Sequence, residues 1–173
     1  MRLPYVPDPP NFTSPEDQAV EQRAESYDDR NSFLGAIRTK TSLSTSVRET
    51  AICRVAVLNK AWYEWESHSP ILKSGEGITD AHVSAVLESA PHKVNDGIQS
   101  EALAAVLTYT DAMTLNVTVP DEVFAKLKNH HSEQEVVEIT ATVAAYNCVS
   151  RFLVALDVGE RNWQKGPLEG GKE

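Results

Sequence analysis

Apolar residues recur every three to four positions through most of the chain, the spacing of amphipathic α-helices. The strongest run starts at Ser44 or Ser46 and contains no Gly or Pro before Pro70. It is long enough for two helices that meet near Asn59 and Lys60. The next glycines, at 75 and 77, are expected to end it.

Cap residues and periodicity predict further helices on both sides of this run. A Ser–Pro pair and two acids open the first of them, and Ser132 with Glu135 forms a capping box before a long apolar helix. The segments VAVL (55–58) and NVTV (116–119) are locally β-prone, yet neither is part of an alternating, hairpin-bounded pattern. An all-α domain is therefore predicted, with additional helices at about 14–23, 31–38, 81–89, 99–115, 123–129 and 136–159.

The length of 173 residues suits one domain with its own core. The first twelve residues contain four prolines, which predicts an extended arm over 1–13. Three glycines among the last eight residues predict a flexible tail, taken as 161–173. The helical domain is thus expected to span 14–160.

The charge balance excludes several classes of partner. The net charge is −9, and no cluster of Lys and Arg is present to neutralise phosphates, so neither nucleic acid nor an anionic membrane is an expected partner. No apolar run is expected to reach the ~20 residues of a membrane helix, and early prolines interrupt any signal peptide. We expect a cytoplasmic protein whose partners are small molecules or copies of itself.

The two cysteines, Cys53 and Cys148, match no CxxC or zinc-ligand spacing. Two reduced, mostly buried thiols are the expected arrangement, with a single long-range disulfide as the alternative.

The segment AWYEWESH, residues 61–68, concentrates side chains that transfer protons. On a helix, Glu64 and His68 occupy one face, and Tyr63 lies beside them. If the helix continued unbroken, Glu49 would project within about 60° of Glu64. These four residues are therefore candidates for an acid–base pocket.

The two tryptophans of this segment, Trp62 and Trp65, would line such a pocket, and burial against them would raise a carboxyl pKa. Cys53 could share the face of Glu49, but its apolar neighbours favour a small core residue. Asn147 and Arg151, one turn apart in an apolar helix, need polar partners, for which a core hydrogen bond is the default.

Each candidate also has a purely structural interpretation. Glu64 and His68 could form an ordinary pair on a helix surface, and Glu49 could close a capping box from Ser46. The aromatic rings could simply cover the core. The pair His130–His131 fits a solvated helix end. No metal site is predicted, because Glu64 and His68 supply only two ligands and no HExxH arrangement is present.

The run LSTSVRETAICRVAVLNKAWYEWESHSPIL, residues 43–72, resembles the carboxymuconolactone decarboxylase family, which includes the alkylhydroperoxidase D-like (AhpD-like) proteins. The YN pair within VAAYNCVSRFLVAL is similar to the last helix of that family. In the peroxidase branch the motif is E-x11-C-x-[YF]-C-x3-H, which Glu49, Tyr63 and His68 match. Ala61 and Glu64 stand where that branch has its two cysteines, so peroxidase activity is not expected.

The resemblance implies an AhpD-like helical bundle and a cofactor-independent lyase or isomerase. Its substrate would be a small carboxylated, lactone or enolisable cyclic compound. In this scheme His68 is the main acid/base, Glu49 orients it, Glu64 is a second base, and Tyr63 donates a hydrogen bond to an enolate oxygen.

The residues expected to line the substrate are Trp62, Trp65, Cys53 and Asn147. The family also implies homo-oligomers, trimers or multiples of them. Two alternatives remain open at this level, a non-catalytic oligomeric ligand-binding protein and, less favoured, a thiol oxidoreductase using Cys53 or Cys148.

Overall fold

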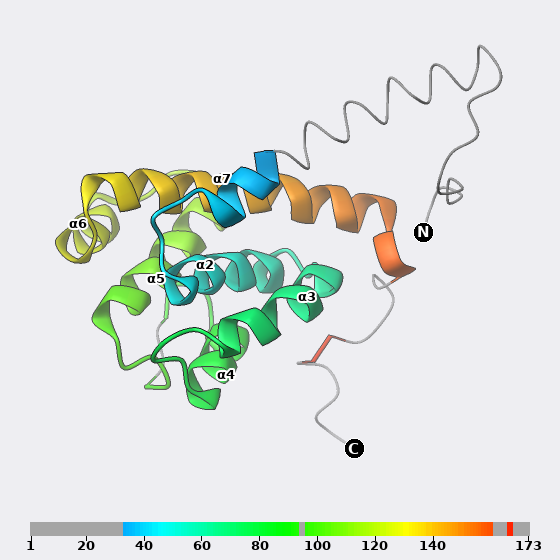
Figure 1. Cartoon of the computed structure of the whole chain (residues 1–173), viewed down its shortest axis with the longest axis horizontal. Coiled ribbons are helices and arrows are strands. Elements are labelled where there is room, and N and C mark those ends of the chain that lie inside the picture. Colours follow the sequence, from blue (N-terminus) through cyan, green and yellow to red (C-terminus); the bar gives the residue numbers. More distant parts are fainter. Residues whose placement is uncertain (1–32, 94–95, 161–165, 168–173) are drawn as a thin grey trace, which may run out of the picture.

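The structure, a computed structural model, describes residues 33–93, 96–160 and 166–167, and every regular element in these ranges is helical (Figure 1). The predicted all-α fold is confirmed. The predicted arm, the helix at 14–23 and most of the predicted tail lie outside the described residues. A helical segment at 33–39 is followed by α2 (Thr45–Leu58), α3 (Trp62–Lys73), α4 (Asp80–Glu88), α5 (Glu101–Leu115), α6 (Asp121–His130), α7 (Glu133–Leu156) and a 3₁₀ turn (Val158–Glu160).

Local sequence signals set most helix starts. The hydroxyl groups of Ser44, Thr79 and Ser100 each accept a hydrogen bond from the first turn of α2, α4 and α5. The capping box of α7 is formed as predicted, with the Ser132 backbone nitrogen 2.8 Å from Glu135 Oε2.

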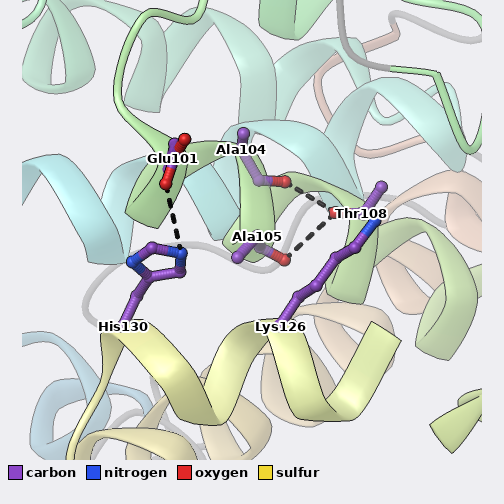
Figure 2. Close-up of a pocket in the computed structure, with 6 residues that line it drawn as sticks. All are labelled: Glu101, Ala104, Ala105, Thr108, Lys126 and His130. Carbon is purple, nitrogen blue, oxygen red and sulfur yellow. Dashed lines mark hydrogen bonds and ion pairs between the residues drawn. The ribbon is translucent and has the colours of Figure 1, made fainter. Parts of the chain in front are cut away.

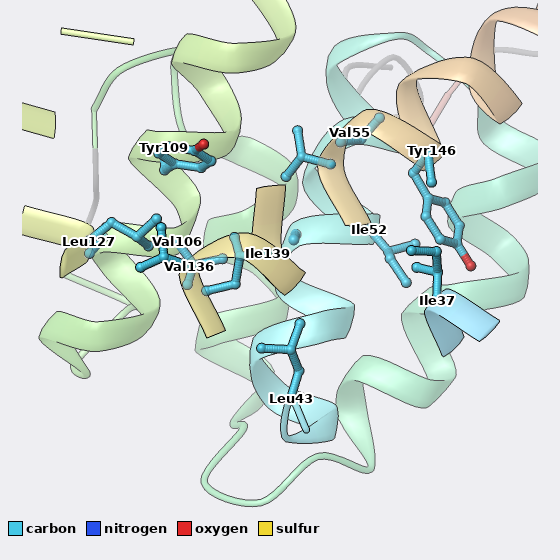
Figure 3. Packing of buried hydrophobic residues seen from close by; sticks show 14 residues of the cluster. Ile37, Leu43, Ile52, Val55, Val106, Tyr109, Leu127, Val136, Ile139 and Tyr146 are labelled. Carbon is cyan, nitrogen blue, oxygen red and sulfur yellow. The ribbon is translucent and has the colours of Figure 1, made fainter. Parts of the chain in front are cut away.

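Helix α2 lies in the middle of the bundle and contacts α3, α4, α5 and α7. All residues from Glu49 to Ala56 are buried, so the helix has no solvent-facing side along this stretch. Apolar clusters cover it on two sides. One cluster joins α2 to α5, α6 and α7 and contains Ile52, Val55, Val106, Tyr109, Leu127, Ile139, Val143 and Tyr146 (Figure 3).

The second cluster joins α2 to α3, α4 and α5. Cys53 and Ala56 of α2 pack there with Trp65 and Leu72 of α3 and with Val86 of α4. Helix α3 is therefore held against α2 by apolar contact at both of its ends.

The predicted junction near Asn59 is a sharp reversal between α2 and α3. Lys60 adopts φ +55°, a left-handed conformation that ends the helix. The Ala61 N–H then donates to Ala56 O at 2.8 Å. The chain returns antiparallel, and at the far end Ser46 Oγ donates to Glu76 O. Glu49 and Glu64 thus lie on two facing helices, which corrects the unbroken-helix geometry assumed from the sequence.

Helix α7 corrects the expectation that no apolar run reaches the length of a membrane helix. Its 24 residues reach a mean hydropathy of 1.4 over their most apolar window. They meet the length and composition of a membrane-crossing helix, although core helices of soluble proteins meet them too. One side of α7 packs on α2 and α5. Only 39% of the most apolar stretch of α7 is buried, so part of this apolar helix is exposed.

Candidate functional site

Four polar side chains of α2 are buried, and three of them are each bonded to a different neighbouring helix. Glu49 bonds to α3, Thr50 to His82 of α4 at 3.1 Å, and Arg54 to Asp111 of α5. A buried polar group without a partner destabilises the fold, so these pairs fix how the helices pack around α2. One of them also has the geometry of an acid–base site.

The candidate site is a hydrogen-bonded line through three helices. Glu49 Oε2 lies 2.7 Å from His68 Nδ1, and His68 Nε2 lies 3.3 Å from the hydroxyl oxygen of Tyr146 on α7. The His68 and Tyr146 rings meet edge to face, with centroids 5.1 Å apart. Exposed fractions of 2% for Glu49, 8% for His68 and 2% for Tyr146 place the line inside the protein.

The partners of the imidazole assign its tautomer. A carboxylate accepts only, so Nδ1–H donates to Glu49 and leaves the Nε2 lone pair to accept from the Tyr146 hydroxyl. Arg48 Nε donates to the other carboxylate oxygen of Glu49 at 3.1 Å. Burial raises the pKa of Tyr146 above its usual value, which keeps the phenol protonated, with the Arg38 charge acting in the opposite direction.

Glu64 is the least satisfied polar group of the site. It is 2% exposed, and neither carboxyl oxygen has a hydrogen-bond partner among the described residues. Burial raises its pKa to about 9, so the group is a neutral carboxylic acid near pH 7. The predicted role of Glu64 as a second base does not fit this protonation state.

The two structural interpretations of the acidic residues are also wrong. Glu64 and His68 are both buried, so they do not form a surface pair. Glu49 closes no capping box, because Ser44 is the cap of α2 and the Ser46 hydroxyl bonds to Glu76 O.

Tyr63 does not join the buried line. Its side chain is 45% exposed, and its ring lies against the backbone of Gly159, where an added Cβ would come within 2.7 Å. The hydroxyl that meets His68 belongs to Tyr146. In the sequence, Tyr146 stood out only as the tyrosine of the YN pair that resembles the last helix of the family. No local periodicity links it to residues 49–68.

The tryptophans occupy different environments. Trp65 is 8% exposed and belongs to the apolar cluster of α2, α3 and α4. Trp62 is partly buried, and the backbone of Gly166 lies directly on its ring. The C-terminal residues that the structure describes thus contact the first turn of α3 at two glycines.

Cys53 is fully buried near Glu49 and Glu64. Burial, with a smaller contribution from the two acidic neighbours, raises the pKa of the thiol well above its usual value, which disfavours a reactive thiolate. Cys148 is exposed on α7, contrary to the expectation of two mostly buried thiols. Both cysteines are free, so the alternative of a disulfide is excluded.

Asn147 has the core hydrogen bonds expected by default. Its amide donates to Thr114 Oγ1 at 3.0 Å, and its carbonyl oxygen accepts from Asn59 at 3.1 Å and from Arg151 at 2.5 Å. Asn59 also donates to Ser150. This network ties the α2–α3 turn to α7 and α5, beside Tyr146.

A groove of 350 Å³ lies elsewhere, between α5 and α6 (Figure 2). None of the predicted site residues lines it; the lining residues are Glu101, Ala104, Ala105, Thr108, Lys126 and His130. His130 lies 3.8 Å from Glu101, and the Thr108 hydroxyl is bonded to backbone carbonyls of α5.

The neighbouring His131 is buried, with Nε2 3.3 Å from Ala102 O, unlike the solvated pair predicted. No group of three or more His, Cys, Asp or Glu in the described ranges has the arrangement of a metal site.

No protein-family model matches the chain, and no curated protein matches it. Solved structures similar in fold include two proteins. The Agrobacterium tumefaciens protein ATU0492, a putative antioxidant defence protein AhpD of unknown function, is 19% identical, with a TM-score of 0.67 over 83% of this chain and 92% of its own.

The debrominase Bmp8, solved as a cysteine-to-alanine variant with 2,3,4-tribromopyrrole, is also 19% identical. Its TM-score is 0.66, over 80% of this chain and 72% of its own. The chain therefore has an AhpD-like helical fold, and the predicted resemblance is confirmed at the level of the fold. Fold alone does not assign an activity.

Proposed function

We propose that the protein is a cofactor-independent acid–base enzyme, a carbon–carbon lyase of the decarboxylase type or an isomerase. Its substrate would be a small carboxylated, lactone or enolisable cyclic compound. One observation carries the proposal, the buried line from Glu49 through His68 to Tyr146. A carboxylate that fixes an imidazole, which in turn meets a second proton carrier, is a common arrangement for general acid–base catalysis.

In the decarboxylation, the bond between the substrate carbon and its carboxylate breaks, CO₂ leaves, and the electron pair stays on carbon as a carbanion or enolate. One proton from the enzyme then forms the C–H bond, and water restores that proton. His68 delivers it from Nε2 when the ring carries both protons, and Glu49 stabilises that charged ring. The Tyr146 hydroxyl, which then no longer donates to Nε2, hydrogen-bonds the developing oxyanion, the role expected from the sequence for Tyr63. An isomerisation uses the same groups to remove a proton from one carbon and return it to another.

Two further observations support this reaction class. Burial raises the pKa of the Cys53 thiol, and the motif positions at Ala61 and Glu64 carry no sulfur, so the candidate site offers no thiolate nucleophile for peroxidase chemistry. The debrominase of similar fold holds a small ring compound in its solved structure, which favours small cyclic substrates as the first to test.

The direct test is to incubate the protein with a panel of lactone acids and β-keto acids and to measure CO₂ release and ring isomerisation. His68→Ala should lower turnover on the order of 10²–10⁴-fold. His82→Ala is the matched control, because it removes another buried imidazole that also bonds α2. Ligand-induced stabilisation without product would favour the alternative of a binding protein, and unchanged turnover in His68→Ala would refute the role of His68.

We also propose that the protein is a homo-oligomer, a trimer or a multiple of it, in the cytoplasm. Helix α7 exposes small and apolar side chains at Val137, Ala144, Cys148 and Ala155, which follow one another by seven or four residues on one face. Small residues allow close helix contact. Antiparallel contact with the α7 of a second copy would place the basic Arg151 of each helix toward the acidic first turn of the other, so a second copy is the proposed occupant. Such a contact is two-fold, so it would join two trimers into a hexamer.

A further inference from the structure

Glu64 is a buried polar group that the acid–base line does not use. Nearly all buried polar groups in proteins have a hydrogen-bond partner. Glu64 is only 2% exposed, and both of its oxygens lack a partner in the described part of the chain. A well-packed helix would tolerate Leu or Met at this position more easily, so the carboxyl group is explained best by a partner that binds from outside.

The residues around Glu64 define which hydrogen-bonding group that partner must present. Helix α2 brings Cys53 near it, α7 brings Tyr146, and His68 lies one turn further along α3. On α4, His82 is already bonded to Thr50. No Lys or Arg in the described ranges pairs with Glu64, and burial raises its pKa to about 9, so near pH 7 the group is a hydrogen-bond donor with an O–H.

The first turn of α3 adds further donors. Ala61 caps the helix without a side-chain hydrogen bond, and the N–H groups of Trp62 and Tyr63 donate to no residue that the structure describes. The N-terminus of this helix, which is 12 residues long, favours negative charge. Glu64 belongs to the same turn, so this turn offers two backbone N–H groups and the Glu64 O–H as hydrogen-bond donors.

We infer that Glu64 is a specificity-determining residue that donates a hydrogen bond to a carbonyl oxygen of the substrate, which restricts substrates to small cyclic ketones and lactones with an enolisable carbon. This inference rests on the proposed function and names its substrate class. The O–H···O bond strengthens as the carbonyl oxygen gains negative charge, and no proton needs to transfer from Glu64. A ligand without an oxygen acceptor leaves the donor unpaired and binds less well.

Difference infrared spectroscopy on the full chain at pH 7 tests this directly, because a protonated carboxylic acid has its own C=O stretch. The band should be present in the wild type and in Glu66→Gln, an exposed control on the same helix, and absent in Glu64→Gln. Glu64→Asp provides a second variant if Gln disturbs folding, since it should move the band without removing it.

Two probes of equal shape then distinguish the effect of the oxygen acceptor from the effect of the ring. Cyclohexanone should shift the band, and methylenecyclohexane, which has no oxygen, should not. Glu64→Leu should weaken cyclohexanone binding about tenfold. A missing band, or a band that neither cyclohexanone nor δ-valerolactone moves, overturns the inference. Because these readouts need no turnover, an inactive protein with a shifting band would refute the proposed function and leave the inference standing.

Discussion

Glu49 Oε2 and His68 Nδ1 lie 2.7 Å apart, although 19 residues separate them and they belong to facing helices. The turn at Asn59–Ala61 brings them together by reversing the chain between α2 and α3. The pair exists only because α2 is buried on all sides around Glu49, so that its carboxylate must find a partner on a neighbouring helix.

Tyr146→Phe should lower turnover on the order of 10²-fold, because it removes the hydroxyl group that meets His68 Nε2. Steady-state kinetics on the substrate found by the panel measure this. The matched control is Tyr109→Phe, which removes another buried hydroxyl, bonded to Thr140 in the same core. Equal turnover in the two variants would contradict a catalytic role for Tyr146.

Glu64→Gln should make the protein more stable than wild type as the pH rises. The pKa of Glu64 is about 9 in the folded state and 4.5 in the unfolded state, so the folded state binds more protons between these values. The stability that the protonated group contributes is fully present below pH 4.5 and is lost as the pH rises toward 9. Between pH 6 and pH 8 the difference should grow by about 3 kcal/mol. Urea unfolding measures it, and a difference that does not change with pH would show that Glu64 is ionised in the fold.

The buried pair of Arg54 and Asp111 should dominate the stability of the helix packing. Arg54 donates to both carboxylate oxygens of Asp111 and to Val86 O, and the His92 N–H also donates to Asp111. Asp111→Ala leaves a buried guanidinium without its counter-charge and should cost about 3–5 kcal/mol in urea unfolding.

The contrast for this pair is the exposed pair of Lys73 and Asp80, whose side chains are 64% and 82% exposed. Asp80→Ala should cost at most about 1 kcal/mol, although Asp80 also begins α4. Similar losses in the two variants would mean that the buried pair contributes no more than a surface contact.

The two thiols should differ sharply in reactivity. Cys148 is exposed and should react with a disulfide reagent in the native protein, whereas Cys53 should react only after unfolding. Cys148→Ser should therefore show no reactive thiol until denaturant is added. Rapid native modification of Cys53, or its oxidation by peroxide, would revive the thiol oxidoreductase alternative.

Ala144→Glu should reduce the mass of the assembly in solution. It places a charge in the middle of the exposed face of α7, where the proposed contact between copies would bury it without a partner. Light scattering after size-exclusion chromatography measures the mass, with Ala81→Glu on the exposed side of α4 as control. A monomeric wild type, or an unchanged mass in Ala144→Glu, would contradict the proposed interface.

Within the described residues, the sequence by itself determined the helices, the capping box of α7 and the break between α2 and α3, because these depend on periodicity and on side chains within a few residues of each other. The motif spacing also singled out Glu49 and His68, which the structure brings together. The missing cysteines at Ala61 and Glu64 were equally visible in the sequence.

Tertiary structure alone decided which hydroxyl meets the imidazole. Periodicity states which residues share a face of one helix, but not which face meets which neighbour. The sequence placed Tyr63 beside Glu64 and His68, whereas packing turns Tyr63 toward Gly159 and supplies the hydroxyl of Tyr146 from a position 78 residues away. The protonation of Glu64 depended on tertiary structure for the same reason, since burial comes from the surrounding helices and not from the residue's neighbours in sequence.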